Sequence, residues 1–354
     1  MEKNCILSVC LIVKNEEKIL KRCLKPVSEF ADEIIIVDTG STDKTVEIAK
    51  QFTPQVYNFT WNNNFSEARN YSFAKANGKY IMWLDADDVI NNENVTKINQ
   101  LKNHLTADTY MAKYKIMDKN NHIVMEFFRE RIVKNCQNAK WNGFLHETIT
   151  PFGVIEYTDF SITHQKQFGK DPKRNLKIYQ HHIKNGTVLN TRELYYYSKE
   201  LFYNQYYSKC ITTLKKFLKA KNQFYANTLD ATLTLSKCFE LKNENQKALK
   251  TLLSALANIS PTSEYVCEIG DIFLRLNNIN MAITYYNFAL TLPPQDTQGV
   301  FVNLDYYYFV PHIQLSVCYY TIKDYEKAKC HHNLAKQFNP NSEIVKNNDK
   351  FFTD

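Results

Sequence analysis

Three carboxylates follow one apolar run in this 354-residue chain. The run Tyr80–Leu84 leads directly into Asp85, Asp87 and Asp88. Carboxylates this close repel one another unless a cation lies among them, and hard oxygen ligands suit Mg²⁺ or Mn²⁺ that also touches a diphosphate. On a surface turn the same cluster would only be solvated. The apolar run before it is typical of a buried strand and favours the metal site.

The elements around this cluster predict an α/β fold. Between residues 5 and 118, short β-branched runs alternate with segments of helical apolar spacing. This alternation predicts a Rossmann-like, mostly parallel sheet covered on both faces. Ligands of such sheets bind at the carboxyl ends of the strands, where Asp38 and Asp85 lie. The expected strands are 5–13, 33–38, 55–59, 80–85 and 109–117, and the expected helices are 16–29, 42–52, 65–76 and 92–105.

From about Thr191 onward the strand pattern gives way to a helical repeat. Ala248 and Ala282 lie 34 residues apart, and the small, aromatic and proline positions around them match the tetratricopeptide pattern. We expect two domains, residues 1–188 and 189–354, the second all-helical. The four expected helical hairpins are centred on Cys210, Ala248, Ala282 and Ala328, with about twelve extra residues near Asp296–Leu304 before the last one.

Tyrosine is concentrated in the repeat half, where 16 of the 23 tyrosines lie beyond residue 190. These rings could fill the gaps between helices, as aromatic residues routinely do in such repeats. They could also line an amphipathic groove for a peptide, because tyrosine is enriched at interfaces. The two roles are compatible for different tyrosines.

Composition excludes several classes of protein. The hydrophobic fraction of 44% is enough for real cores, and the net charge of +7 is spread over both halves without a basic arm, which argues against a nucleic-acid partner. No window reaches the ~18 apolar residues of a membrane span. Nine cysteines without a CxxC pair predict reduced, mostly buried thiols and a cytoplasmic location. The adjacent pairs His181-His182 and His331-His332 are expected at the surface.

Four motifs resemble those of family 2 glycosyltransferases of the GT-A fold, and they occur along the chain in the order found in that family. The resemblance covers roughly residues 5–185. With the repeats, the chain is most similar to the branch that includes the sublancin-type peptide S-glycosyltransferases, and two later motifs, Trp141–Glu147 and Ile162–His164 with Arg174–Leu176, resemble that branch as well. The four motifs are Ser8–Glu16, Ile36–Asp43, Asn64–Asn70 and Trp83–Asp88.

The resemblance implies an inverting, metal-dependent hexosyltransferase with a nucleotide-diphosphate sugar, favouring UDP, as donor. It implies that Asp38 contacts the base or ribose, although Thr39 stands where many members have a second acid. Arg69 corresponds to a basic contact to the nucleotide sugar, the alternative being a surface ion pair with Glu67. Asp87 corresponds to the direct metal ligand, and Asp85 is either a second ligand or turned toward the ribose or sugar.

The later motifs supply the acceptor side. Glu147 is the candidate base that takes the acceptor proton, with His146 orienting it or acting as base itself. Trp141 could stack on the sugar. The alternative for Glu147 is an ion pair with Arg129 or Arg131.

A late histidine and a basic loop complete the candidate site. His164 could complete the metal shell, since imidazole is an acceptable Mn²⁺ ligand, or be satisfied by the backbone. The loop after it, with Lys166, Lys170, Lys173 and Arg174, is expected to close over the diphosphate.

Several alternatives stay open at this point. The acceptor could be a Cys, Ser or Thr side chain of a peptide or protein held partly by the repeats, or a cell-surface or lipid-linked glycan. The chain could also be a tetratricopeptide adaptor with an inactive transferase domain, which the intact set of Arg69, Asp85, Asp87 and Glu147 argues against. A terminal helix near residues 347–352 could pair two copies of the chain.

Overall fold

The computed structural model describes residues 5–117, 123–165, 171–221, 223–294 and 303–352. The chain divides into two compact units, Met1–Asn185 and Gly186–Asp354, called unit 1 and unit 2 below. Among the described residues, no helix has both the length and the apolar character that a bilayer span requires.

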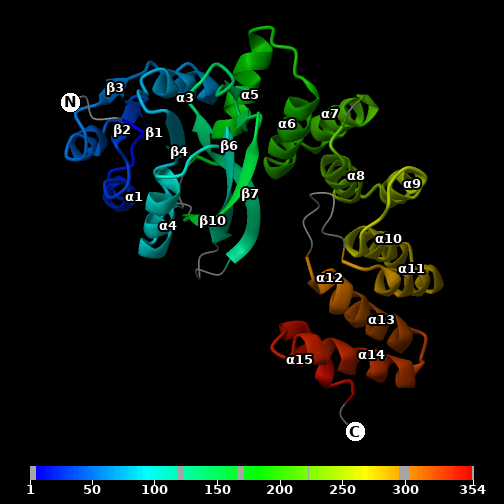
Figure 1. Ribbon diagram of the computed structural model, residues 1–354. Helices are drawn as coiled ribbons and strands as arrows, with labels where there is room; N and C mark the ends of the chain where they lie inside the picture. The colour runs from blue at the N-terminus through cyan, green and yellow to red at the C-terminus, as the bar shows by residue number, and fades with distance from the viewer. Residues whose placement is uncertain (1–4, 118–122, 166–170, 222, 295–302, 353–354) are drawn as a thin grey trace. The chain divides into compact units, whose positions relative to one another are not determined.

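Unit 1 is built on an eight-stranded mixed sheet with the strand order β3-β2-β1-β4-β7-β6-β10-β5 (Figure 1). Strands β3, β2, β1 and β4 are parallel, β7 runs antiparallel between β4 and β6, and β10 is parallel to β6. The short β5 pairs antiparallel with β10. The strands are β1 Leu7–Val13, β2 Glu33–Asp38, β3 Val56–Asn58, β4 Tyr80–Leu84, β5 Asp88–Val89, β6 Thr109–Met117, β7 Ile123–Lys134 and β10 Ile155–His164, and β8 Trp141–Asn142 pairs with β9 Thr148–Ile149 as a separate ribbon.

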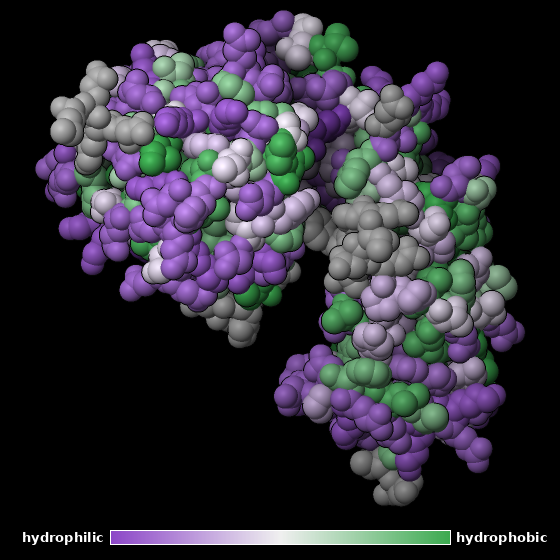
Figure 2. Space-filling model, in the orientation of Figure 1, coloured by the Kyte–Doolittle hydropathy of each residue, from purple (hydrophilic) through white to green (hydrophobic). Residues whose placement is uncertain are grey.

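Alternation along the strands divides the apolar side chains between two faces of the sheet. Val9 and Met82 belong to the larger core, which includes residues of α1, α2 and α4. Cys10 and Trp83, their neighbours in sequence, belong to the second core with Phe73 of α3. Helices therefore cover both faces, and the face of unit 1 visible in Figure 2 is largely hydrophilic. The helices of unit 1 are α1 Leu20–Val27, α2 Thr45–Ala49, α3 Phe65–Phe73, α4 Asn92–Lys102 and α5 Arg174–Lys184.

The described residues of unit 2 form four helical hairpins. Helices α6 and α7, α8 and α9, α10 and α11, and α13 and α14 pack as neighbours along the chain. The four residues expected at the hairpin centres are fully buried. Most of the expected insertion near Asp296–Leu304 lies outside the described residues. The helices are α6 Thr191–Tyr203, α7 Tyr207–Lys219, α8 Tyr225–Glu240, α9 Asn245–Ala255, α10 Ser263–Arg275, α11 Ile279–Thr291, α12 Asp305–Tyr308, α13 Val310–Thr321, α14 Tyr325–Phe338 and α15 Glu343–Asp349.

Close packing within a hairpin is clearest at Gly270 of α10. A Cβ atom at this position would lie 2.7 Å from Cε1 of Tyr286 on α11. The Tyr286 ring is fully buried, so it has no room to move away. The small residue at this position therefore lets the two helices approach.

The expectation that His331 and His332 lie at the surface is wrong. His332 is 1% exposed, and its Nε2 lies 2.8 Å from Oδ1 of Asp349. His331 is half-buried, with its Nδ1 2.9 Å from Nδ1 of His312 on α13. Both imidazole rings contact neighbouring helices, because α13 covers one side of α14 and α15 covers another.

The cysteines are mostly buried, as expected. All nine are free thiols, and six of them are buried. Cys5 is half-buried, and burial raises the pKa of its thiol. Cys136 of unit 1 and Cys330 of unit 2 are exposed.

Candidate active site

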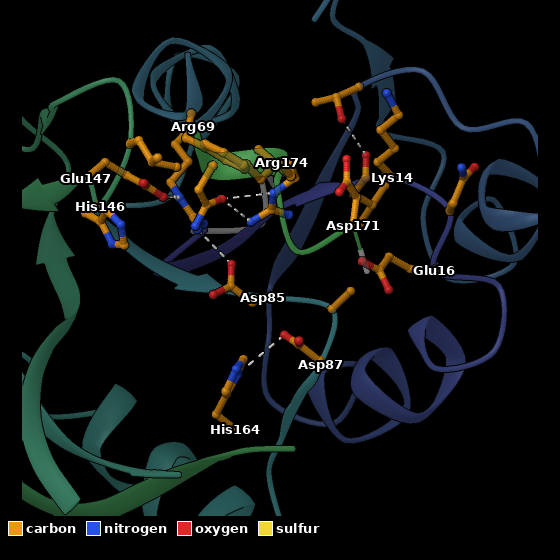
Figure 3. Close-up of a pocket in the computed structure, with 18 residues that line it drawn as sticks. Lys14, Glu16, Arg69, Asp85, Asp87, His146, Glu147, His164, Asp171 and Arg174 are labelled. Carbon is orange, nitrogen blue, oxygen red and sulfur yellow. Dashed lines mark hydrogen bonds and ion pairs between the residues drawn. The ribbon is translucent and has the colours of Figure 1, made fainter. Parts of the chain in front are cut away.

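A cavity of ≈ 760 Å³ opens at the carboxyl ends of β1 and β4 (Figure 3). Its position is the one expected for ligands of a parallel α/β sheet. Most of the site residues predicted from the sequence line it. These are Arg69, Asp85, Asp87, His146, Glu147, His164 and Arg174.

The turn after β4 is fixed by Asp88, the third carboxylate of the cluster predicted from the sequence. The Asp88 backbone N–H donates to the Asp85 carbonyl at 3.0 Å, and the Asp85 N–H donates to Oδ2 of Asp88, also at 3.0 Å. Strand β5 starts at Asp88 and pairs with β10 so that His164 lies opposite Asp88. The pairing of β5 with β10 thus brings the late histidine to the acidic turn.

Asp87, Asp88 and His164 form the group that could hold a cation. Their ligand atoms all lie within 4.8 Å of one another. Nδ1 of His164 is buried and lies 3.4 Å from Oδ1 of Asp87 (Figure 3). It lies 3.5 Å from Oδ1 of Asp88, and both distances are long for hydrogen bonds. Two carboxylates and an imidazole nitrogen are a donor set that Mn²⁺ accepts. The residues therefore fit the metal that the sequence predicted.

Neighbouring acids change the protonation of His164. Burial lowers the pKa of this imidazole, but the close Asp88 carboxylate and the charges of Asp87 and Asp85 outweigh burial, so its pKa is raised.

Asp85 is not in this group, because its carboxylate is used elsewhere. Its Oδ1 accepts a hydrogen bond from Nη2 of Arg69 at 2.8 Å. Burial raises the pKa of Asp85, but the charge and hydrogen bond of Arg69 and the charge of Arg131 outweigh it and lower the pKa to about 2. Two roles were predicted for Asp85, that of a second metal ligand and that of a contact to the ribose or sugar. The bond to Arg69 fits the second role better than the first.

Arg69 holds two acids of the cavity at once (Figure 3). It lies on α3, which Asn64 caps by accepting a hydrogen bond from the Glu67 N–H. Its side chain is buried, with Nε donating to Oε1 of Glu147 at 2.7 Å and Nη2 donating to Asp85. Burial lowers the pKa of the guanidinium, but Asp85 and Glu147 outweigh burial and raise it, so Arg69 stays charged. The alternative prediction, a surface ion pair of Arg69 with Glu67, is wrong, since Glu67 bonds to Asn62 and Asn64.

Glu147 therefore has a partner other than the two suggested by the sequence. Arg129 pairs with Glu130, and Arg131 pairs with Asp88. Glu147 reaches Arg69 because the segment before it turns sharply, with φ of 91° at Gly143 and 53° at His146. The Phe65 N–H at the start of α3 donates to the Phe144 carbonyl at 2.9 Å and fixes this segment beside the helix.

Trp141 lies behind the cavity rather than in it. Its side chain is 2% exposed and packs against Trp83 at 4.9 Å between ring centroids. The Arg69 guanidinium lies 4.7 Å from the Trp141 ring centre and separates the ring from the acids. This arrangement contradicts stacking of Trp141 on the sugar, because Arg69 and the second core occupy its faces.

Asp38 is likewise turned into the protein. It is 5% exposed, and its carboxylate accepts hydrogen bonds from the backbone N–H groups of Gly40 and Ser41. The adjacent Thr39 lines the cavity, and Asp38 does not. Contact of the Asp38 carboxylate with the base or ribose is thus not supported by this geometry, in which Asp38 shapes the loop after β2.

The sequence analysis missed a group of polar residues that line the cavity. Lys14, Asn15 and Glu16 line it directly after β1, and Asp171 lines it before α5. The first three belong to the motif Ser8–Glu16, so this motif was the signal that could have found them. Of the predicted basic loop, Arg174 lines the cavity at the start of α5, whereas Lys166 and Lys170 lie outside the described residues.

Comparisons with known proteins relate the chain to glycosyltransferases and to a repeat-containing protein. The model of glycosyl transferase family 2 matches residues 8–159. A TPR repeat-containing protein of Synechococcus elongatus is 40% identical over 144 residues, which are 40% of this chain and 35% of that protein. The prophage-derived glycosyltransferase SunS of Bacillus subtilis is 27% identical over 252 residues, which are 64% of this chain and 58% of that protein. The chain thus spans between about a third and three fifths of the length of these curated relatives.

Solved structures give weaker likenesses. S. aureus TarS 1-349 in complex with UDP-GlcNAc is 14% identical with a TM-score of 0.39, over 94% of this chain and 91% of that one. MamA is 16% identical with a TM-score of 0.38, over 47% of this chain and 88% of that one. Both TM-scores are low, so the fold assignment rests on the strand order described above. Residues 8–159 of this chain thus match the model of glycosyl transferase family 2, and the helical hairpins of unit 2 follow them.

Proposed function

We propose that the protein transfers a hexose, with inversion, from a nucleotide-diphosphate sugar to a Cys, Ser or Thr side chain of a peptide or protein. The family 2 domain supports the reaction class, and the similarity to glycosyltransferase SunS supports a member of this kind with appended repeats. A uridine donor rests on the family resemblance. The repeats of unit 2 would hold part of the acceptor.

The charge balance at the end of β4 is the observation that carries this proposal. Asp85, Asp87, Asp88 and Glu147 bring four carboxylates to one end of the sheet, where Arg69 and Arg131 supply two guanidiniums. A divalent cation would compensate the remaining negative charge. Such a cation, held by Asp87 and His164 with Asp88 beside them, would neutralise charge that develops on a departing diphosphate.

The residues of the chain then divide between donor and acceptor. Arg69 and Arg174 line the cavity, and their guanidiniums can bind phosphate oxygens. Arg69 would do so while it remains bonded to Asp85. The acceptor oxygen or sulfur attacks the anomeric carbon as the bond from this carbon to the diphosphate oxygen breaks. Its proton passes to a base on the opposite side of the sugar from the diphosphate.

Glu147 is the proposed base, with His146 as the alternative. The Glu147 carboxylate lines the cavity, and its hydrogen bond to Arg69 fixes its direction. A thiol acceptor, with its pKa of ~8.5, would need a weaker base than a hydroxyl.

Donor hydrolysis tests the proposal directly. UDP- and GDP-sugars are screened with and without Mn²⁺, using the wild type and Asp87→Ala, and candidate peptides are then searched for a hexose mass shift. We expect metal-dependent turnover of a UDP-sugar that Asp87→Ala abolishes. Failure of every donor to bind or react under all metal conditions would contradict the proposal, whereas transfer to a glycan alone would move the acceptor to that class.

A further inference from the structure

Arg131 lies under the acidic turn because of a β-bulge in β7. Across the β6–β7 pair, Ile132 lies opposite Tyr110 and Glu130 lies opposite Met111, so Arg131 is an extra residue between two paired positions. A bulge of this kind re-aims the side chain at that point of a strand, and bulges are frequent beside active sites.

The Arg131 side chain is fully buried and ties three parts of the sheet together. Its Nη1 donates to the Trp83 carbonyl and to Oδ2 of Asp88, both at 3.2 Å. The guanidinium carbon lies 3.6 Å from the centre of the Trp83 ring and 4.2 Å from that of Tyr114. The Tyr114 hydroxyl donates to the other oxygen of Asp88 at 2.8 Å. Asp88 is thus held from both sides.

The unpaired atoms of Arg131 show what the aromatic rings contribute. Its Nε and Nη2 are buried and have no hydrogen-bond partner. Ring faces attract a cation, and this attraction is largest when the cation is shielded from water. The rings of Trp83 and Tyr114 therefore take the place of water around the part of the guanidinium that has no hydrogen bond.

Arg131 shares the Trp83 ring with Arg69. The Arg69 guanidinium carbon lies 4.7 Å from the Trp141 ring centre and 5.3 Å from that of Trp83, and the Arg131 guanidinium lies near Trp83 and Tyr114. Arg69 bonds to Asp85 and Glu147, and Arg131 bonds to Asp88. The carboxylates of the turn are therefore held by one connected cluster of rings and guanidiniums.

The buried ion pair of Arg131 and Asp88 is not explained by a gain in folding stability. Desolvating two charges costs several kcal/mol per ion, and well-packed apolar residues in such places are often as stable or more so. Arg131 does not line the cavity, so it cannot bind the donor directly. Asp88, however, lies within the candidate cation group and holds the turn between Asp85 and Asp87.

We infer that Arg131 is a positioning residue, which fixes Asp88 and thereby the geometry in which the acidic turn and His164 take up a divalent cation. This role rests on the proposed function of the same site. The planar guanidinium is needed for it, because an ammonium group cannot bond two acceptors and stack between two rings at once.

The test compares cation binding with folding in matched variants. The variants are Arg131→Lys, which keeps the charge, and Tyr114→Phe, which removes one hydrogen bond to Asp88 and keeps the ring. Ile98→Ala is the control, a cavity in the core on α4 that should lower stability without involving the turn. Melting temperature, Mn²⁺ binding followed by electron paramagnetic resonance, and calorimetric binding of UDP with and without Mn²⁺ are measured on the full chain.

We expect Arg131→Lys to weaken Mn²⁺ binding, alone and with UDP, by about tenfold or more, the effect of one lost charge-assisted contact. Tyr114→Phe should weaken it by about threefold to tenfold. Metal-independent binding of UDP should be unchanged in both. Ile98→Ala should lower the melting temperature and leave Mn²⁺ affinity at the wild-type value.

Two results would overturn the inference, and they differ from each other. If Arg131→Lys and Tyr114→Phe bind Mn²⁺ like the wild type, or if Ile98→Ala loses as much Mn²⁺ affinity as they do for the same loss of melting temperature, Arg131 has a structural role alone. If the wild type itself binds neither Mn²⁺ nor UDP with Mn²⁺, the proposed function fails and the positioning role fails with it. Should Arg131→Lys not fold, Tyr114→Phe decides the matter.

Discussion

Arg69 stands between the donor side and the acceptor side of the cavity. One nitrogen of its guanidinium bonds to Asp85 and another bonds to Glu147, which lie on different elements. A lysine would keep the positive charge but reach only one of the two acids, leaving the other buried without its partner. The residue thus couples the orientation of the proposed base to that of the acidic turn.

We expect Arg69→Lys to lower turnover of the donor by on the order of 10²-fold, the size found when one preorganised donor is removed from an active site. The binding of UDP should change less, because the charge remains. Steady-state kinetics and calorimetry on the purified variant measure the two effects. Arg22→Lys serves as control, since the exposed Arg22 bonds to the side chain of Gln165. Equal kinetics in Arg69→Lys and wild type would show that the fork of Arg69 is dispensable.

Single residues were predicted unevenly from the sequence. The acids after β4 and the motif around Glu147 could be identified because each is a compact stretch of sequence. Their partners could not, because Arg69 and Glu147 are 78 residues apart and Arg131 and Asp88 are 43 apart. Trp141 was misplaced for the same reason, since its burial depends on Arg69 and Trp83 from other elements.

At the scale of the elements, the early strands follow the sequence closely. Strands β2 and β6 have the predicted bounds, and β1, β3 and β4 differ by one or two residues at their ends. Their apolar runs are continuous because helices cover both faces of the sheet. Strand β7 was not predicted, because it carries charged residues in its middle that are neutralised by partners from other strands.

The hairpin α10–α11 should be sensitive to volume at Gly270. Gly270→Val would place methyl groups against the atoms of the fully buried Tyr286 ring. We expect a loss of about 2–3 kcal/mol in the free energy of unfolding, although valine has a better helix propensity than glycine. Denaturant unfolding of unit 2 followed by circular dichroism gives this value. Ser254→Val on the exposed side of α9 should change it by less than about 0.5 kcal/mol. Similar values for both variants would refute close packing at Gly270.

The pair of His312 and His331 makes the last hairpin sensitive to acid. Burial and the charge of His331 lower the pKa of His312 to about 4, and burial lowers the pKa of His331. Because the folded pKa of His312 lies below its ordinary value of ~6.5, the unfolded chain binds more protons between these values. The stability of this hairpin should therefore fall as pH drops from about 7 to about 4.

For these half-buried rings we expect the loss to be about 1–2 kcal/mol after allowance for solvent screening. Unfolding curves at several pH values measure it, and ring-proton titration by NMR gives the pKa of His312. His312→Asn should flatten the pH dependence. An ordinary pKa near 6.5 for His312 in the folded chain would contradict this explanation.

At the scale of the whole molecule, each unit has an apolar core of its own. The two cores of unit 1 lie on the two faces of its sheet, and a separate cluster around Phe309 and Ile313 lies in unit 2. The residues that line the cavity belong to unit 1 and lie between Ile12 and Asn175 in the sequence. Donor chemistry and acceptor holding are thus expected to be separable.

We expect residues 1–185, produced alone, to fold and to hydrolyse the donor at a rate within a few-fold of the full chain. Transfer to a peptide acceptor should fall much further, because the proposed acceptor-holding repeats are missing. Thermal melting, donor hydrolysis and peptide mass shift are compared for the fragment, the full chain and the fragment mixed with residues 186–354. Undiminished peptide transfer by the fragment would exclude a role of the repeats in holding the acceptor.

The distribution of the thiols gives an experimental handle on these two units. Cys136 and Cys330 are the exposed cysteines, one in each unit, while six others are buried and the half-buried Cys5 has a raised pKa. Maleimide dyes should therefore attach at two positions without any engineered cysteine, and Cys5→Ser would remove the slow third site. Energy transfer between the two dyes would then report, molecule by molecule, whether the span between the units changes when donor and acceptor bind.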